Sequence, residues 1–202
     1  MTTVKEIPAK LVAELRARTG AGMMDCKRAL EEAGGDLAKA EEIVRVKYAA
    51  KAGKRAGRTA AEGVIQGYIH FTGRVGVLVE LNCETDFVAR NEAFRQLAKD
   101  LALHIASARP AAVRVEDLPA DVVARERRIY EAQAAEQKKP EPIRATIVEG
   151  MLRKFYEESV LLEQKFVKDD TRTVGDLIQA VAGKTGEKVE VRRFARFELG
   201  SA

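Results

Sequence analysis

The chain has 202 residues, of which 46% are hydrophobic and 33% charged, a balance typical of a globular protein with its own core. No apolar run approaches the ~20 residues that a membrane helix needs, and the first residues lack the pattern of a signal peptide, so we expect a cytoplasmic protein without a membrane partner. The net charge of +4 is too small to identify a partner, and the two cysteines, Cys26 and Cys83, are expected to be reduced thiols.

One segment near the N-terminus is strongly basic. Such a run can bind phosphates or an acidic surface, and the competing interpretation is a solvated helix end followed by a basic linker over residues 51–58. An RNA-binding surface would also need aromatic rings for base stacking, and Tyr48 is the one aromatic residue in this segment. Residues 43–61 contain no acid, and their bases are Arg45, Lys47, Lys51, Lys54, Arg55 and Arg58.

Residues 1–52 are expected to form three short helices around a modest core. Gly20 and Gly22 suit the end of the first helix, and Gly34–Gly35 the end of the second. Asp36 can cap the third helix through its side-chain oxygen. The apolar positions at helical spacing are Leu11, Val12 and Leu15 in the first helix, Met23, Cys26, Ala29, Leu30 and Ala33 in the second, and Leu37, Ala40, Ile43 and Val44 in the third.

The hydrophobic period changes after residue 62. Two runs of alternating and β-branched residues, 63–71 and 74–82, flank Thr72-Gly73 and predict a β-hairpin. A helix should follow, with Asn91 as its cap and an end near Pro110. Its apolar stripe consists of Phe94, Leu97, Leu101 and Ile105.

The second half of the chain adds further helices and one strand. A half-buried strand is expected where Val189, Val191, Ala195, Phe197 and Leu199 occupy alternate positions, with Arg193 and Phe194 breaking the alternation. Helices segregated from a small antiparallel sheet make an α+β fold. The expected elements are a loop at 111–120, a charged helix at 121–137, a break at 138–142, a helix at 143–159, a mixed segment at 160–168, a helix capped by Thr173 that Gly183 and Gly186 end, and a strand at 189–199.

The sequence does not favour an enzyme. The two histidines, His70 and His104, lie in a predicted strand and a predicted helix without companions that would make a nucleophile and base. The acids around residues 80–86 lack the turn glycine of a cation loop, and Gly20-Ala-Gly22 lacks the context of a phosphate loop. We therefore expect a protein-interaction module without a cofactor or a metal.

Residues 85–88, Thr-Asp-Phe-Val, lie between the predicted hairpin and the helix after it. One interpretation is structural: Asp86 caps the helix and Phe87 fills the core, where phenylalanine is most often found. The other is a docking surface. For Met23 and Met24, helical spacing places one side chain in the core and the other at the surface, where a thioether suits a partner. Cys83 fits a small apolar position at a strand end.

Three stretches resemble one family, the bacterial translation elongation factor Ts. They are Leu11–Leu30 with Arg-Thr-Gly-Ala-Gly-Met-Met-Asp-Cys-Lys-Arg-Ala-Leu at its end, Val75–Arg90 with Asn-Cys-Glu-Thr-Asp-Phe-Val-Ala-Arg, and Phe194–Gly200. The resemblance implies a ubiquitin-associated-like three-helix domain with a basic linker (1–57) and an α+β core (58–202). The chain is similar to the compact members with one core subdomain, which implies a non-covalent homodimer.

The resemblance also implies a function. Members of the family are guanine-nucleotide exchange factors that bind elongation factor Tu in its GDP-bound and nucleotide-free forms. In such a factor Thr85, Asp86, Phe87 and Val88 would dislocate the partner's magnesium ion. The N-terminal domain would dock through Arg16, Met23 and Met24, and a secondary contact would fall at His70 or Phe71. The alternative is an RNA- or ribosome-binding protein that uses residues 43–61.

Overall fold

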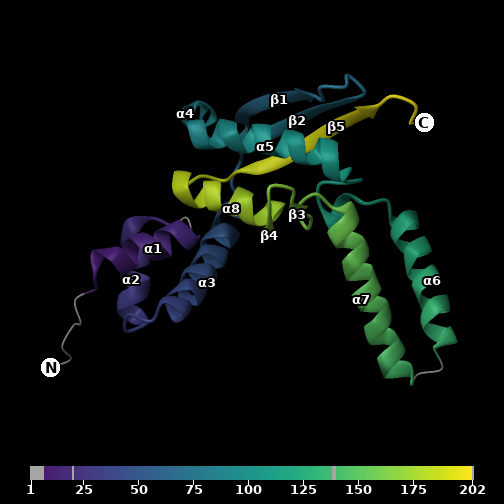
Figure 1. Cartoon of the computed structure of the whole chain (residues 1–202), viewed down its shortest axis with the longest axis horizontal. Coiled ribbons are helices and arrows are strands. Elements are labelled where there is room, and N and C mark those ends of the chain that lie inside the picture. Colours follow the sequence, from purple (N-terminus) through teal and green to yellow (C-terminus); the bar gives the residue numbers. More distant parts are fainter. Residues whose placement is uncertain (1–6, 20, 138–139, 202) are drawn as a thin grey trace. The chain divides into compact units, whose positions relative to one another are not determined.

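The computed structural model describes residues 7–19, 21–137 and 140–201, and these residues form an α+β fold with a small antiparallel sheet, as the sequence predicted. Gly20 and the predicted break at Lys138 and Lys139 lie outside the described residues. In chain order (Figure 1) the elements are α1 (Ala9–Thr19), α2 (Met23–Glu32), α3 (Leu37–Ala56), β1 (Glu62–Ile69), β2 (Val75–Cys83), α4 (Asp86–Ala89), α5 (Glu92–Ala108), η1 (Val115–Asp117), α6 (Ala120–Glu136), α7 (Glu141–Ser159), β3 (Lys165–Phe166), β4 (Asp169–Thr173), α8 (Val174–Thr185) and β5 (Glu190–Glu198).

The chain divides into two compact units that are not continuous in sequence. The first unit comprises Met1–Val64, Leu81–Leu97 and Asp176–Glu190, and the second comprises Ile65–Glu80, Ala98–Gly175 and Val191–Ala202. One sheet has the strand order β1-β2-β5, and a second pairs β3 with β4. Within the described residues, none of the helices combines the length and apolar character that a membrane crossing requires.

In the first unit, α1, α2 and α3 enclose one core, as their apolar stripes predicted. Asp36 caps α3, because its Oδ1 accepts the N–H of Lys39 at 3.1 Å. Such a cap satisfies one of the backbone donors that a helix start leaves unpaired. The buried side chains are Val12, Leu15, Ala21, Cys26, Ala29, Leu30, Ala40 and Val44.

The end of α3 differs from the prediction of a solvated basic linker. The helix continues to Ala56, and Arg55 is buried, with its Nη1 donating to the backbone oxygen of Ala182 at 3.1 Å. Ala182 lies in the last turn of α8, where the helix dipole favours a cation, and its backbone oxygen also accepts the N–H of Gly186 at 3.0 Å. The linker interpretation is therefore wrong at Arg55, whereas the side chains of Lys51 and Lys54 lie outside those that the structure describes.

The predicted hairpin of β1 and β2 is present. The backbone N–H of His70 donates to the backbone oxygen of Val75 across the turn at 2.9 Å. Gly73 in the turn has a φ of 67°, a conformation that favours glycine. Where β1 begins, Gly63 has a φ of 151°, and a Cβ there would lie 2.1 Å from the backbone oxygen of Leu81. Only glycine permits this close approach of the two strands.

Strand β5 is present, but its second half faces the opposite way from the prediction. Ala195, Phe197 and Leu199 are exposed. The alternation slips at two consecutive exposed residues, Arg192 and Arg193, and after them Arg196 takes the covered side. Its guanidinium donates to the backbone oxygen of Ala106 at 3.3 Å and to Glu198 at 2.8 Å. These partners satisfy a charge that would be costly to bury alone.

Helix α5 begins where the sequence predicted, since Asn91 Oδ1 accepts the N–H of Ala93 at 2.9 Å, and its apolar stripe is buried. Helix α8 contains Gly183 instead of ending there. Four short elements were not predicted: α4, η1, β3 and β4. Each is a few residues long, which is too short for a periodic pattern to develop.

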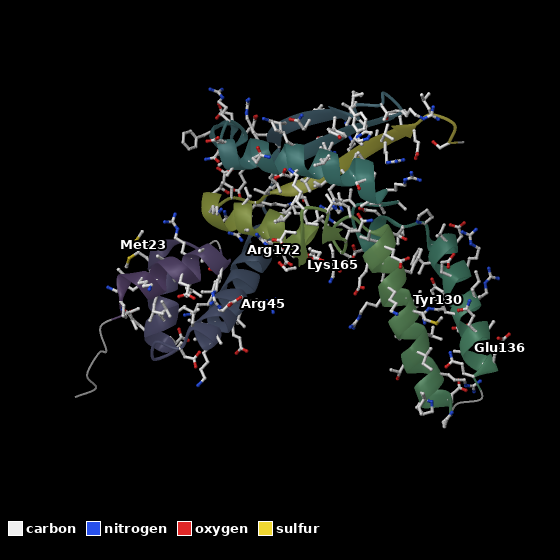
Figure 2. The ribbon with its side chains drawn as sticks, in the orientation of Figure 1. Met23, Arg45, Tyr130, Glu136, Lys165 and Arg172 are labelled. Atoms are coloured by element: carbon white, nitrogen blue, oxygen red, sulfur yellow. The ribbon has the colours of Figure 1, made fainter. Side chains whose placement is uncertain are left out.

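In the second unit, the predicted helices at 121–137 and 143–159 are present as α6 and α7, which lie side by side as a hairpin (Figure 1). Tyr130, Ala134, Val148, Leu152 and Tyr156 pack between them. Figure 2 labels Tyr130 and Glu136 on α6.

Candidate functional site

The Thr85–Val88 segment forms the turn from β2 into α4. Thr85 is extended and its hydroxyl accepts the N–H of Val88 at 3.3 Å, so Thr85 is the cap of this helix and the predicted cap, Asp86, is wrong. Asp86 instead lies in the first helical turn and pairs with Arg90 at 2.8 Å, with both side chains mostly exposed. The hydroxyl is the better cap because it precedes the helix by one residue.

Phe87 projects from this turn into solvent. Its side chain is 78% exposed, whereas the neighbouring Val88 is 5% exposed and belongs to the core. The interpretation in which Phe87 fills the core is therefore wrong, and Val88 takes that place. An exposed phenylalanine is available for a partner, and its burial would contribute about 1.5–3 kcal/mol to binding.

A carboxylate from the far end of the chain holds the turn. Glu187, which follows α8, accepts the backbone N–H groups of Glu84 and Thr85 on Oε2 at 3.0 Å each. Its Oε1 accepts the hydroxyl of Thr85 at 2.6 Å. Hydrogen bonds to an ionised acceptor are stronger than neutral ones, so these three contacts fix the start of the Thr85–Val88 segment.

Glu84 makes the reciprocal contact. Its carboxylate accepts the backbone N–H of Lys188 at 2.6 Å and the guanidinium of Arg58 at 3.2 Å. The N–H of Lys188, with Arg58 acting in the same direction, lowers the pKa of the Glu84 carboxyl below its ordinary value. Glu84 and Glu187 thus each bind the backbone of the segment that carries the other.

Cys83 lies buried beneath the turn, as a small apolar residue would. Its thiol donates to the backbone oxygen of Thr85 at 3.2 Å. Burial raises the pKa of this thiol to about 11, and the nearby Glu187 adds to the shift. Such a thiol is a poor nucleophile and a poor metal ligand. Among the described residues, no group of three or more metal-ligating side chains is present.

The residues expected to dock the N-terminal domain lie at the surface of α1 and α2. Met23 and Met24 are 59% and 62% exposed, so the expectation that one of them is buried is wrong. The core is filled by Cys26, Ala29 and Leu30 further along α2. Figure 2 shows Met23 at the edge of this helical group. Arg16, on α1, is also exposed.

His70 and Phe71 lie at the turn of the hairpin in the second unit. Phe71 is 90% exposed, and the ring centroids of His70 and Phe71 are 4.4 Å apart. The ring Nδ1 of His70 lies 3.0 Å from the hydroxyl of Tyr68. Phe71 is therefore the more accessible of the two for a partner, while His70 is partly engaged within its own strand.

The basic segment offers less free charge than its sequence suggests. Arg55 is buried against the end of α8, and Arg58 pairs with Glu84 at 3.2 Å. Lys47 forms an ion pair with Glu32. Arg45 is exposed on α3 and labelled in Figure 2. Arg55 is thus unavailable to RNA, and Lys47 and Arg58 are engaged in ion pairs that are largely exposed.

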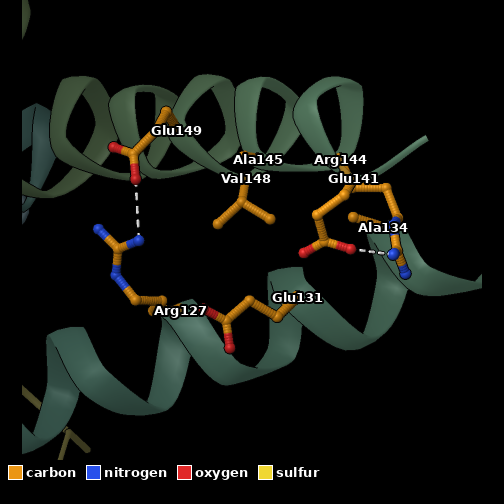
Figure 3. A pocket seen from close by; sticks show the side chains of 8 residues that line it. All are labelled: Arg127, Glu131, Ala134, Glu141, Arg144, Ala145, Val148 and Glu149. Carbon is orange, nitrogen blue, oxygen red and sulfur yellow. Dashed lines mark hydrogen bonds and ion pairs between the residues drawn. The ribbon is translucent and has the colours of Figure 1, made fainter. Parts of the chain in front are cut away.

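A hollow of about 330 Å³ lies between α6 and α7 (Figure 3). Arg127 pairs with Glu149 at 2.8 Å, and Arg144 pairs with Glu141. A ligand with either charge would have to displace one of these ion pairs. The remaining lining residues are Glu131, Ala134, Ala145 and Val148.

One face of the β1-β2-β5 sheet exposes apolar side chains in the second unit. Two of these side chains occupy space that glycines on the neighbouring strand leave free. A Cβ added to Gly76 would lie 3.1 Å from Cδ1 of Ile69, and one added to Gly67 would lie 3.4 Å from Cδ2 of Leu78. Phe71 and Leu199 extend this area at the strand ends. We call Ile65, Ile69, Leu78 and Phe197 the open sheet face, since these four side chains are exposed on the strands of one sheet.

Most sequence-predicted site residues thus lie where a partner can reach them, with Val88 buried. The residues that sequence reasoning missed are Glu187 and Lys188, and the role of Arg58 as a partner of Glu84 was missed with them. No local signal could have found them, because the contacts of Glu187 span 102 residues or more of the chain.

Comparison with known proteins points to one family. Residues 36–201 match the model described as "Elongation factor TS". The chain is similar to "Elongation factor Ts" of Desulforamulus reducens, with 58% identity over 96% of this chain and 90% of the relative. It is also similar to "Elongation factor Ts" of Anaeromyxobacter sp. strain K, with 57% identity over 96% and 89%. The protein of the same name from Thermotoga petrophila has 54% identity over 96% of this chain and 97% of its own length.

Proposed function

The chain belongs to the elongation factor Ts family, and from this premise we propose that it is the guanine-nucleotide exchange factor of its elongation factor Tu. It binds the GDP-bound and nucleotide-free forms of that GTPase and promotes the release of GDP, after which GTP binds. The observation that carries the proposal is Phe87, an aromatic ring that is 78% exposed on a turn held by hydrogen bonds.

Phe87 acts as a wedge. Its ring enters an apolar slot of the GTPase near the bound Mg²⁺, Thr85 and Asp86 complete the contact, and the buried Val88 anchors the segment in the core of this protein. Mg²⁺ requires near-ideal octahedral geometry and bridges phosphate oxygens of the nucleotide. A small displacement of its ligands therefore weakens nucleotide binding steeply. The chemistry takes place in the partner's site, so this protein is not an enzyme and needs no cofactor of its own.

Exchange then follows from thermodynamic linkage. If the factor lowers the affinity of elongation factor Tu for GDP, GDP lowers the affinity for the factor by the same ratio. The factor is released when nucleotide rebinds, and it can act on the next GTPase molecule. Phe87 therefore has to discriminate between the two states of the partner, since a ligand with equal affinity for both would shift nothing.

Residues 1–57 form the docking domain, with a ubiquitin-associated-like arrangement of α1 to α3, and residues 58–202 form the core. The docking domain contacts the GTPase through Arg16, Met23 and Met24. Both thioethers are exposed on α2, and a flexible thioether adapts to a partner surface. Phe71, with His70 beside it, makes the secondary contact from the core.

Two copies of the chain form a homodimer through the open sheet face. The side chains of Ile65, Ile69, Leu78 and Phe197 are exposed, and mutual burial of these faces would remove them from water. Ala195, which is exposed on β5, provides no thiol, so the pairing is non-covalent there. The protein works in the cytoplasm, where its partner is found, and it needs no nucleic acid or membrane.

The test is nucleotide release. Elongation factor Tu is loaded with a fluorescent GDP analogue, an excess of unlabelled GDP is added, and the fluorescence decay is followed with and without this protein. We expect accelerated release at stoichiometric protein, and more at saturation. An unchanged rate would reject the proposed function. An RNA-binding filter assay at low and high salt tests the alternative, because binding through residues 43–61 would fall steeply with salt.

A further inference from the structure

The turn that carries Phe87 cannot hold its shape by itself. Helix α4 has only four residues, Asp86–Ala89. A helix of about one turn is unstable in isolation, because nucleation costs more than a single hydrogen bond returns. The side-chain cap by Thr85 satisfies the N–H of Val88, but it does not connect the turn to the rest of the protein. Other contacts must keep the conformation of the turn when the ring of Phe87 packs against a partner.

Val88, buried in the core, and the thiol of Cys83 hold the turn from beneath. The hydrogen bonds to its first peptide groups come from the segment after α8. The two carboxylate oxygens of Glu187 together accept three donors: the N–H of Glu84, the N–H of Thr85 and the hydroxyl of Thr85, at 3.0, 3.0 and 2.6 Å. A single carboxylate therefore fixes two successive peptide groups and the rotamer of the cap. Glu187 is half-buried, which strengthens such charge-assisted hydrogen bonds relative to an exposed site.

The clamp works in both directions. Glu84 accepts the N–H of Lys188 at 2.6 Å and the guanidinium of Arg58 at 3.2 Å. The ammonium group of Lys188 in turn donates to the backbone oxygen of Arg58 at 3.1 Å. The turn is thus bound to two other segments of the first unit, the one that follows α3 and the one that follows α8. We call these contacts the Glu84–Glu187 clamp.

We propose that Glu187 is a positioning residue for nucleotide exchange, which holds the Phe87 wedge rigid through the hydrogen bonds it accepts from Glu84 and Thr85. The inference rests on the proposed function and deepens it. Without Glu187 the ring still reaches the partner, but part of its burial energy is lost in deforming its own turn instead of displacing the partner's helices. The expected consequence is a lower maximal release rate with little change in affinity for nucleotide-free elongation factor Tu.

The test compares Glu187→Ala with Glu187→Gln. The alanine variant should lower the maximal rate of GDP release at saturating factor about tenfold, the loss expected for a hydrogen bond to a charged acceptor. The glutamine variant should retain most of the rate, because its amide oxygen can still accept both N–H groups. Glu163→Ala, which removes a carboxylate from an exposed position, is the matched control and should behave as wild type.

Hydrogen–deuterium exchange gives the second readout. In Glu187→Ala the peptide that covers residues 83–88 should take up deuterium faster, while peptides from the buried part of α5 stay protected. Phe87→Ala should lower the acceleration of GDP release by at least about tenfold and leave that protection intact. If Glu187→Ala does not fold, Glu187→Asp replaces it, since its shorter side chain cannot reach all three donors.

The outcomes separate the two proposals. Normal release by Glu187→Ala, or unchanged protection of residues 83–88, would overturn the positioning role while the exchange function stands. A wild-type protein that leaves GDP release unchanged would overturn the exchange function and the role with it. A slow alanine variant that glutamine does not rescue would show a general structural defect and also overturn the role.

Discussion

Nε2 of His104 donates a hydrogen bond to Oε1 of Gln164 at 2.9 Å, and the two side chains are 0% and 4% exposed. On its other side, Nδ1 of His104 accepts the N–H of Val167 at 3.3 Å. The amide of Gln164 donates in turn to the backbone oxygens of Ala108 and Glu158 at 3.3 and 2.6 Å. This buried network joins the ends of α5 and α7, and it requires a neutral imidazole because one ring nitrogen must accept.

The second unit should therefore lose stability in mild acid. Burial lowers the pKa of His104 below its ordinary value of 6.5, while the bond to Gln164 opposes the shift. Below pH 6.5 the unfolded chain binds a proton that the folded chain does not, so the stability that is present above pH 6.5 is lost as the pH falls toward the folded pKa. For one group the slope is at most about 1.4 kcal/mol per pH unit.

Urea unfolding of wild type and His104→Asn at pH 7.5 and 5.5 measures how much unfolding free energy each protein loses in acid. The variant should be less stable at pH 7.5 and should show a smaller loss between the two pH values. Equal losses in both proteins would assign the acid sensitivity to carboxyl groups instead, among which Glu84 also has a lowered pKa.

Replacing the exposed ring of the wedge should separate activity from folding. Phe87→Ala should lower the acceleration of GDP release by at least about tenfold, since about 1.5–3 kcal/mol of ring burial is removed from the complex. The unfolding free energy should change by less than about 0.5 kcal/mol, because the ring is exposed in the free protein.

Ile143→Ala is the control for that experiment, since it removes an exposed apolar side chain from α7. Its release rate should equal that of wild type. Full activity in Phe87→Ala would reject the wedge, and equal losses in both variants would point to a general effect of the substitutions.

A charge on the open sheet face should produce monomers. Phe197→Asp places a carboxylate in the proposed dimer interface, where burial without a partner is costly. The dissociation constant measured by analytical ultracentrifugation should rise at least about a hundredfold. Ile143→Asp, an equivalent change on α7, should leave it unchanged. A wild-type chain that sediments as a monomer at micromolar concentration would contradict the dimer.

Two glycines should respond to alanine in opposite directions. At Gly63 a Cβ would lie 2.1 Å from the Leu81 oxygen, whereas at Gly53, inside α3, it would meet nothing within 4 Å. Gly63→Ala should cost about 3 kcal/mol and lower the melting temperature by roughly 6–12 °C. Gly53→Ala should gain about 0.5–1 kcal/mol, because alanine is the better helix former. Circular dichroism melts decide between these outcomes, and a stable Gly63→Ala would refute the close approach of β1 and β2.

Periodicity predicted the elements that are long enough to show it. The stripe from Phe94 to Ile105 identified α5, and the run from 63 to 82 identified the hairpin. The caps by Asp36 and Asn91 were also readable, because each bonds a backbone group within three residues. Local patterns suffice where the determining contacts are local.

The errors occur where distant contacts decide. Arg55 is a base in a basic run, and only Ala182, 127 residues away, makes it a buried residue. Phe197 alternates with charged residues, which predicts that its side chain is buried. Arg196 instead takes the covered side, where it bonds the backbone oxygen of Ala106, and Phe197 is exposed. The wedge itself could be found through its resemblance to a family, but its support by Glu187 could not.

The Glu84–Glu187 clamp also has a consequence for biosynthesis. Thr85 and Glu187 are 102 residues apart, so at roughly 5–20 residues per second a ribosome makes the motif several seconds before the carboxylate that orders it. During that interval a nascent chain displays the complete Thr-Asp-Phe-Val sequence without its rigid geometry. Chains cut short before Glu187 by premature termination or proteolysis should keep the motif but exchange nucleotide poorly, so incomplete copies would not compete with the finished factor for its GTPase.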